Sequence, residues 1–444
     1  MAGDVINGEI PEHWEFTTLG EVCERGGGSI QTGPFGSQLH ASDYVPVGIP
    51  SIMPTNIGDN RIIEDGIVRI TEGDADRLRQ HRLRAGDIVY SRRGDVEKRA
   101  LIRKHEEGWL CGTGCLKVRL GSGVVDPLFA SLFLGHPAIR EWIVRHAVGA
   151  TMPNLNTAIM SAVPFALPPR AEQEAIAAVL GTLDDKIELN RRMNATLEAI
   201  VRALFQSWFV DFDPVRAKLD GRSSAALNPA TSALFPEHFA HVGHDMLPVG
   251  WRYAAIDEMC AINAWTLGKS DDLATLEYVE ISEVSRGDIA NVVTYSRGDE
   301  PSRARRRLRH GDTVISTVRP DRGAYFLALN PPTNRVASTG FAVLTPTKVP
   351  WSFLHAALTQ QQVSDYLGQM ADGGAYPAVR PEVIGAIQIA LPNESKILEA
   401  FHSISAPLFE RAEANRIQSR TLAKLRDTLL PKLLNGELRV KRDS

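Results

Sequence analysis

The amino-acid sequence carries one ordered set of short motifs twice, and this internal duplication constrains the fold more than any other feature. The segment Leu83–Asp87 is matched in the second half of the chain by Leu308–Asp312. Three further pairs follow the same order: Trp14 with Trp251, Gly149–Pro153 with Gly373–Pro377, and Leu167-Pro168 with Leu391-Pro392. A long helical segment follows each Leu-Pro pair. Two copies of one unit, each a mixed domain and then a helix, predict a molecule with pseudo-two-fold repetition.

Length and composition indicate a globular protein with more than one domain. A chain of 444 residues exceeds what a single hydrophobic core usually organises. Apolar residues make up 43% of the chain, and no apolar run reaches the roughly 18 residues that a membrane-spanning helix needs. The 4 cysteines are too few for a disulfide framework, so a reducing cytoplasm is the expected location.

Both halves predict α+β domains. In the first half, short β-rich runs such as Asp87–Ser91 and Gly114–Leu120 stand among turn-forming residues, and a helical stretch near Pro127–His146 follows. The second half repeats this pattern, with a strand at Thr313–Val318 and a helix near Ser352–Met370.

The segment after the first domain has apolar or amide residues spaced alternately four and three apart. An unbroken heptad register over about 33 residues predicts a helix that packs along another helix. Its members are Ile176, Leu180, Leu183, Ile187, Asn190, Asn194, Leu197, Val201, Leu204 and Trp208. The end of the chain repeats the register in weaker form at Phe401, Ser405, Leu408, Ala412, Asn415, Ser419, Leu422, Arg426, Leu429 and Leu433.

Each long helix is the natural partner of the other, and an antiparallel coiled-coil pair of roughly 55 to 60 Å would separate the two α+β domains. Asn190 and Asn415 fall on the seam, where an amide can fix the register at some cost in stability; solvent exposure is the alternative. The expected boundaries are residues 1–168 for the first domain, 169–212 for a central spacer helix, 213–246 for a polar linker, 247–392 for the second domain, and 393–444 for the C-terminal spacer helix and tail.

This order of segments resembles a known family. Glu172–Ile176, Leu183–Asn190 and Trp208–Pro214, with Leu433–Glu437 at the end of the chain, resemble the specificity subunit of Type I restriction–modification systems. The motif Gly33–Ser37 is similar to one variety of target-recognition domain in that family. The resemblance covers essentially the whole chain.

The resemblance implies that each α+β domain is a target-recognition domain that reads one half of an interrupted, asymmetric sequence in double-stranded DNA. It implies that the helix pair sets the gap between the halves and docks two copies of a DNA adenine methyltransferase subunit, which a nuclease–translocase restriction subunit can join. S-adenosylmethionine, ATP and magnesium are then expected in the partner subunits, and no cofactor, metal or catalysis in this chain.

Arginine-rich segments occupy equivalent places in both copies, and arginine is the residue that most often reads bases or neutralises phosphates in DNA. Because the net charge is −4, such a surface is expected to be local or completed by a partner. The candidates of the second copy are Arg303, Arg305, Arg306, Arg307, Arg309, Arg319 and Arg322. The candidates of the first copy are Arg77, Arg79, His81, Arg82, Arg84, Arg92 and Arg93. Solvated loops, or pairing with neighbouring acids such as Asp87, Asp95 or Asp321, are the alternatives.

Two further groups are candidates for DNA contact. The glycine-containing loop at Gly36, Ser37 and Gln38 allows close backbone approach, with a simple tight turn as the alternative. The residues that lie within or just after the matched Gly-to-Pro motifs are Asn154, Asn156, Tyr376 and Arg380. A structural turn at these positions is equally compatible with the sequence.

A cluster of large aromatic residues stands at the end of the first helical segment and consists of Phe205, Trp208, Phe209 and Phe212. It is predicted either to pack the helix against a domain or to bind a partner subunit, because large aromatic side chains anchor interfaces.

Two other functions are weighed against DNA recognition. A self-contained DNA-modifying enzyme is disfavoured, because Asn330–Thr333 has threonine where amino-methyltransferases have an aromatic residue, and no glycine-rich cofactor loop accompanies it. A coiled-coil adaptor with no DNA role is the second alternative.

Overall fold

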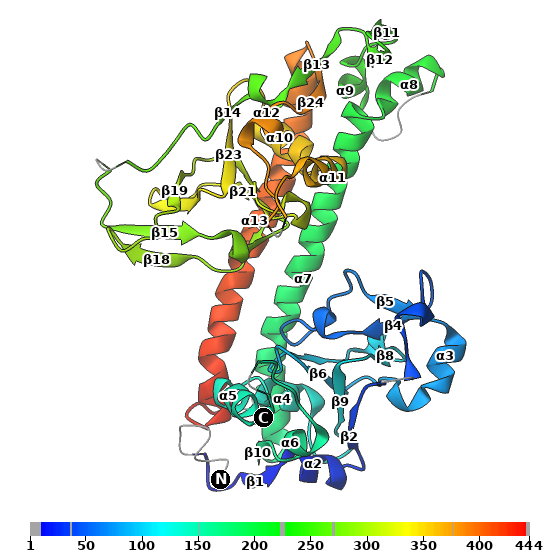
Figure 1. The fold of residues 1–444 in the computed structure, drawn as a ribbon, viewed down its shortest axis with the longest axis vertical. Helices are drawn as coiled ribbons and strands as arrows, with labels where there is room; N and C mark the ends of the chain where they lie inside the picture. The colour runs from blue at the N-terminus through cyan, green and yellow to red at the C-terminus, as the bar shows by residue number, and fades with distance from the viewer. Residues whose placement is uncertain are drawn as a thin grey trace. The chain divides into compact units, whose positions relative to one another are not determined.

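The computed structural model describes residues 10–35, 38–149, 151–222, 227–268, 271–374 and 376–440. The chain forms two compact units. Unit 1 comprises Met1–Ile187 and Arg420–Ser444, and unit 2 comprises Glu188–Ser419. Each unit contains one α+β domain and a part of each of the two long helices, α7 (Arg170–Phe209) and α13 (Ser395–Leu434) (Figure 1). The α+β class and the long helix pair predicted from the sequence are confirmed.

Unit 1 has two four-stranded sheets and one two-stranded ribbon. The first sheet is antiparallel, in the order β2 (Ser29–Thr32), β9 (Cys115–Arg119), β6 (Ile88–Ser91) and β7 (Arg99–Leu101). The second has the order β3 (Tyr44–Val45), β5 (Val68–Ile70), β4 (Ile49–Ile52) and β8 (Leu110–Cys111), with β4 and β8 parallel. The ribbon pairs β1 (Glu15–Thr18) with β10 (Pro164–Leu167).

The helices of unit 1 that precede α7 are short and lie between the strands along the chain. They are α2 (Leu19–Arg25), α3 (Glu72–Arg77), α4 (Pro127–Phe133), α5 (Pro137–His146) and α6 (Thr157–Ser161). The helix predicted near Pro127–His146 is therefore two helices. The break falls before Pro137, because proline disfavours helical conformation in the residue that precedes it and lacks the amide that would continue the helix.

Unit 2 repeats this plan with additions. One sheet has the order β14 (Cys260–Ile262), β23 (Phe341–Pro346), β20 (Asp312–Ser316) and β21 (Tyr325–Ala328). The other has the order β18 (Val293–Ser296), β15 (Thr275–Val279), β22 (Arg335–Ser338) and β19 (Ala304–Arg307), with β15 and β22 parallel. Two-stranded pairs join β13 (Trp251–Ala255) to β24 (Gln388–Pro392) and β16 (Val284–Ser285) to β17 (Asp288–Ile289).

The helix predicted near Ser352–Met370 is also two helices, α10 (Trp351–Leu358) and α11 (Gln361–Met370), and α12 (Pro381–Gly385) precedes β24. The segment predicted as a polar linker holds regular structure in its described residues. It forms α8 (Asp213–Leu219), α9 (Pro229–Ala233) and a hairpin of β11 (Phe239–Val242) with β12 (Asp245–Pro248). In the described part of the chain, no helix combines the length and the apolar character needed to cross a bilayer.

The heptad register of α7 is the seam along which it packs, because none of its ten predicted members is exposed. In unit 1, Ile176 and Leu180 share a hydrophobic core with Leu430 and Leu433 of α13. In unit 2, α7 contributes Val201, Phe205, Trp208 and Phe209, and α13 contributes Ile397, Leu398, Phe401 and Phe409, to the core of the α+β domain. Within each unit the two helices run antiparallel.

Amide side chains occupy one end of the seam in unit 2. Asn190 is fully buried and donates from Nδ2 to Gln418 Oε1 at 2.9 Å. Asn415 is also buried and donates to Asn194 Oδ1 at 2.9 Å, and Asn194 donates to the backbone oxygen of Ala412 at 3.0 Å. A buried amide without a partner costs stability, so these hydrogen bonds favour one register of the two helices.

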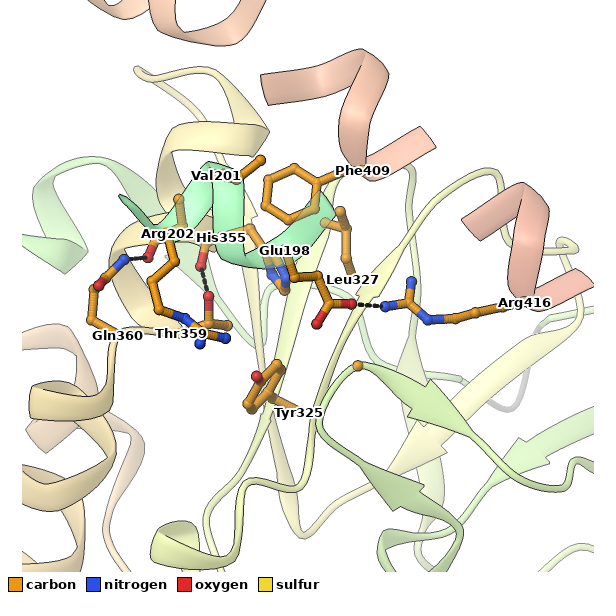
Figure 2. A pocket seen from close by; sticks show the side chains of 12 residues that line it. Glu198, Val201, Arg202, Tyr325, Leu327, His355, Thr359, Gln360, Phe409 and Arg416 are labelled. Carbon is orange, nitrogen blue, oxygen red and sulfur yellow. Dashed lines mark hydrogen bonds and ion pairs between the residues drawn. The ribbon is translucent and has the colours of Figure 1, made fainter. Parts of the chain in front are cut away.

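In each unit an arginine of α13 joins α7 through an ion pair. In unit 1, Arg426 contacts Asp184 of α7 at 2.8 Å and Asp59 of the α+β domain at 3.1 Å. In unit 2, Arg416 pairs with Glu198 of α7, and Figure 2 shows the two side chains pointing toward each other in a pocket beside Tyr325. Both ion pairs are partly desolvated, so loss of one partner would leave the other charge poorly compensated.

The matched Gly-Asp motifs place a buried aspartate at the start of one sheet strand in each unit, but the two aspartates differ in their partners. Asp87 of unit 1 accepts a hydrogen bond from Nε of Arg119 at 2.8 Å. By strand register Thr345 occupies the place of Arg119 in unit 2, and no ion pair to Asp312 is formed among the described residues. Burial therefore raises the pKa of Asp312 to about 6.

Replacement of this second aspartate is expected to stabilise the protein in a pH-dependent way. The pKa of Asp312 is about 6 in the folded state and about 3.9 in an unfolded chain, so its ionisation opposes folding increasingly from about pH 4 to pH 6. Asp312→Asn should raise the free energy of unfolding by about 3 kcal/mol at pH 7.5, and the gain should vanish below about pH 4.

Thermal unfolding of the full chain at pH 4.5 and pH 7.5 measures this gain. Asp87→Asn is the matched control and should lower the melting temperature at pH 7.5, because it leaves Arg119 without its carboxylate. An Asp312→Asn gain that is the same at both pH values would contradict the assignment.

Candidate DNA interface

In unit 2, two segments far apart in the sequence are clamped together by main-chain hydrogen bonds. The first segment is Thr317–Arg319, directly after β20, and the second is Pro377–Val379, before α12. Val379 N donates to Thr317 O at 2.9 Å, and Arg319 N donates to Pro377 O at 2.8 Å. We call the two segments the loop pair of unit 2.

Unit 1 contains the same arrangement, which we call the loop pair of unit 1. It joins Arg92–Gly94, directly after β6, to Pro153–Leu155, before α6. Leu155 N donates to Arg92 O at 2.9 Å, and Gly94 N donates to Pro153 O at 3.1 Å. The hydrogen bonds of the two loop pairs correspond one to one, so the motifs that the sequence repeats form a structural repeat.

The loop pair of unit 2 lies where several strands of the two sheets begin or end. Gly340, between β22 and β23, accepts a hydrogen bond from Thr317 N at 2.9 Å. Its neighbour Thr339 donates to the backbone oxygen of Arg303 at 2.8 Å, just before β19. Arg303 is therefore brought to the same edge of unit 2 as Arg319 and Tyr376.

The corresponding edge of unit 1 holds the glycine loop. Gly114 accepts from Arg92 N at 2.8 Å, and Gly33 N donates to Cys115 O at 2.9 Å. Glycine is required at position 33, since a Cβ atom there would lie 2.1 Å from the backbone oxygen of Gly112. Gly36 and Ser37, which the sequence nominated for DNA contact, lie outside the described residues.

Two other predicted residues of unit 1 are connected to this loop. Gln38 accepts from Phe35 N through its side chain at 3.2 Å, and its backbone oxygen accepts from Arg77 at 2.9 Å. Arg77 also pairs with Asp74 at 2.8 Å. Arg93 is exposed on the loop pair, whereas Arg79 is exposed in a separate turn, Arg79–His81.

The arginine cluster of unit 2 is divided by the fold. Arg305 shares the carboxylate of Glu300 with Arg297, and Arg307 pairs with Asp271 at 2.9 Å. In contrast, Arg303 is exposed at the edge of unit 2 that holds the loop pair, and Arg322 and Arg380 are exposed on either side of the loop pair. Among the residues that the structure describes, these last three have no ion-pair partner. Acidic residues outside the cluster therefore neutralise part of the positive charge that the sequence predicted for it.

Arg306 and Arg309 differ from the rest of the cluster. Arg306 is half-buried, and burial lowers the pKa of its guanidinium. Arg309 is exposed and its guanidinium carbon lies 3.1 Å from the centre of the Trp265 ring, a cation–π contact.

Several predicted contact residues have clear structural roles. Arg92 donates from Nε to the backbone oxygen of Leu155 at 3.2 Å and so reinforces the loop pair. Asn156 caps helix α6 by accepting from Ile159 N at 2.8 Å. Asn154 is half-buried and forms the main-chain bridge to Val148. Asn154 and Asn156 therefore have structural roles, as the structural-turn interpretation of the sequence predicts.

The aromatic cluster is a core element, which corrects the prediction that it binds a partner. Phe205, Trp208, Phe209 and Phe212 are between 1% and 8% exposed and belong to the hydrophobic core of unit 2. Phe209 lies 5.6 Å from Trp251 and 4.9 Å from Phe353, measured between ring centres. Their surface is already buried within the unit, so it is not available to another subunit.

Sequence reasoning missed Met152, which occupies the position of Tyr376 in the matched Gly-to-Pro motif. Its side chain is 63% exposed, and that of Tyr376 is 73% exposed. The alignment of the two motifs was the available signal, since it placed both residues directly before the matched proline.

Comparisons with known proteins agree with this arrangement. Residues 11–199 match the model of the Type I restriction modification DNA specificity domain. The chain is 27% identical to the Type I restriction enzyme HindI specificity subunit of Haemophilus influenzae, over 88% of this chain and 95% of that protein. It is 23% identical to the Type I restriction enzyme MjaIX specificity subunit of Methanocaldococcus jannaschii, over 98% and 95% of the two chains.

A solved structure shares the fold. The S subunit of a Type I restriction–modification system from M. genitalium aligns with a TM-score of 0.52 and 17% identity, over 96% of each chain. The matched model is a DNA specificity domain, and both relatives are named as specificity subunits. The duplicated α+β plan, the two long helices and the sequence matches agree: residues 11–199 match a Type I restriction modification DNA specificity domain, and the chain is similar along nearly its whole length to specificity subunits of Type I restriction enzymes.

Proposed function

We propose that each α+β domain of this chain reads one half of an interrupted, asymmetric sequence in double-stranded DNA. The observation that carries the proposal is the loop pair, which recurs in both units with the same main-chain hydrogen bonds. An exposed side chain directly precedes the second segment of each loop pair, Met152 in unit 1 and Tyr376 in unit 2, at an edge where backbone and base edges of a duplex can be contacted.

Asymmetry of the two half-sites is supported by the side chains of the loop pairs and of the residues directly before their second segments. Unit 1 has Gly94 and Met152 where unit 2 has Arg319 and Tyr376. Direct readout depends on the hydrogen-bonding groups that reach the base edges, so different side chains on one scaffold favour different bases.

In this proposal the paired helices α7 and α13 set the interval between the half-sites and dock two DNA adenine methyltransferase subunits, to which a nuclease–translocase restriction subunit can bind. The partners supply S-adenosylmethionine, ATP and magnesium, and the complex acts in the cytoplasm. The polar seam supports a ruler function, because its hydrogen bonds favour a single register.

Selection of duplexes from a random-sequence library by the full chain, with and without the methyltransferase subunits, tests the proposal directly. Two fixed blocks of bases separated by unselected positions are expected. A single block would contradict bipartite recognition. No enrichment under either condition would favour a coiled-coil adaptor, and DNA cleavage or methylation by the chain alone would favour a self-contained enzyme.

The charge arrangement of unit 2 predicts which arginines neutralise phosphates. The triple substitution of Arg303, Arg322 and Arg380 to Ala should lower affinity and reduce the slope of log K against log salt by about 2 to 3, because each released counterion contributes about 0.9. The double substitution of Arg305 and Arg307 to Ala is the control and should change the slope less, since Glu300 and Asp271 already pair with these side chains. Equal slope changes per arginine would contradict this division.

Exchange of residues 247–392 for the corresponding domain of a relative should change one block of the selected sequence and leave the other block unchanged. The reason is that each unit has its own hydrophobic core, which its α+β domain shares with the adjoining helix segments, and its own loop pair. Sequencing of selected duplexes measures the result. A change in both blocks would show that the domains do not read independently.

Removal of one heptad from α7 together with the facing heptad of α13 is expected to shorten the gap between the two blocks. A seven-residue deletion preserves the seam and removes about 10 Å of helix, close to three base pairs of duplex at 3.4 Å each. An unchanged gap in the selected sequences would mean that the helices do not set the interval.

A further inference from the structure

Arg319 holds a backbone conformation that arginine rarely adopts. Its φ of 47° and ψ of 56° lie in the left-handed region. It also precedes Pro320, and the residue before a proline normally prefers an extended conformation. The matching residue of unit 1 is Gly94, with φ of 74°, and glycine adopts this region without strain. Unit 2 therefore keeps a side chain at a turn that unit 1 forms with glycine.

The side chain retained at this turn lies against an exposed aromatic ring. The guanidinium carbon of Arg319 is 4.8 Å from the centre of the Tyr376 ring, and Tyr376 is 73% exposed. A ring that is this exposed contributes little to a hydrophobic core. Arg319 is half-buried, and the cation–π contact with the ring limits the positions that its guanidinium can take.

We propose that Arg319 and Tyr376 form a reading pair in the second recognition domain, in which Tyr376 positions the guanidinium and Arg319 donates two hydrogen bonds to O6 and N7 of a guanine in the major groove. This inference rests on the proposed function and names the base that one loop pair reads. The planar fork of arginine matches the two acceptors of guanine, and this is the commonest base-specific contact in protein–DNA complexes.

The loop pair of unit 1 lacks both members of the reading pair. Gly94 has no side chain, and Met152 stands in place of Tyr376, although the main-chain hydrogen bonds are the same. The guanine read in this way therefore belongs to only one of the two half-sites. The contrast also supplies a conservative variant for the test, because glycine is the residue that unit 1 uses at the turn.

The test compares duplexes selected from a random library by the full chain with those selected by Arg319→Gly. The wild type should fix a guanine at one position in one block, and Arg319→Gly should lower that preference roughly tenfold to hundredfold. The other block should be unchanged. Because glycine relieves the left-handed strain, the melting temperature of the variant should be equal to or above that of the wild type.

Substitutions of the tyrosine separate positioning from structure. Tyr376→Ala should weaken the preference at the same guanine, whereas Tyr376→Phe should retain it, because the stacking requires the ring and not the hydroxyl. Arg319→Lys should lose most of the preference, since an ammonium cannot form the two-pronged contact. Arg380→Ala is the control and should lower affinity for all sequences alike.

The outcomes separate this inference from the function on which it rests. If the wild type selects two blocks and Arg319→Gly leaves every base preference unchanged, the reading pair is wrong and bipartite recognition stands. If Tyr376→Ala leaves the guanine preference intact, the positioning role of the tyrosine is wrong. If the wild type selects no sequence, the proposed function fails and the reading pair fails with it.

Discussion

The burial of the helical seam within each unit is the constraint on which the rest of that unit depends. Helices of forty residues such as α7 and α13 gain little stability from helix propensity alone and require an apolar partner along their length. The seam residues meet that requirement in both units, because α7 and α13 contribute side chains to both cores. An α+β domain and the helix segments beside it therefore share one hydrophobic core, and neither is complete without the other.

Polar groups on the seam add specificity to this burial. Apolar residues alone tolerate several registers, whereas the amides Asn190, Asn194 and Asn415 find their partners in one. Arg426 links the seam to the α+β domain of unit 1, because it contacts Asp184 of α7 and also Asp59 of that domain. Although burial opposes the charge, the two carboxylates raise the pKa of Arg426 above its usual value. The angle at which a recognition domain meets the helices is thus tied to the register of the seam.

The sequence predicted the features that depend on periodicity and repetition, and missed those that depend on distant partners. The heptads and the matched motifs are local patterns, so the two helices and the duplicated α+β plan could be read directly. The arginine cluster could not be interpreted in the same way, because Asp271 pairs with Arg307 from a different segment of the chain. The aromatic cluster was ambiguous for a related reason. A sequence contains the same phenylalanines whether they pack in a core or bind a partner. The packing of Phe353 and Phe401 against Phe205 and Phe209 shows that they belong to a core.

The loop pairs show how a recognition domain can vary its side chains without altering its fold. They are held by main-chain hydrogen bonds, which do not depend on side-chain identity: every residue has the carbonyl acceptor, and every residue except proline has the N–H donor. The prolines at 153 and 377 take part only as acceptors, so they satisfy the clamp as well as any residue would. Positions such as 94 and 319, or 152 and 376, can then change freely in chemistry while the backbone that presents them stays fixed. Left-handed strain at Arg319 is the exception to this freedom, and an arginine kept at a strained turn where unit 1 has glycine is consistent with a functional contact at this position.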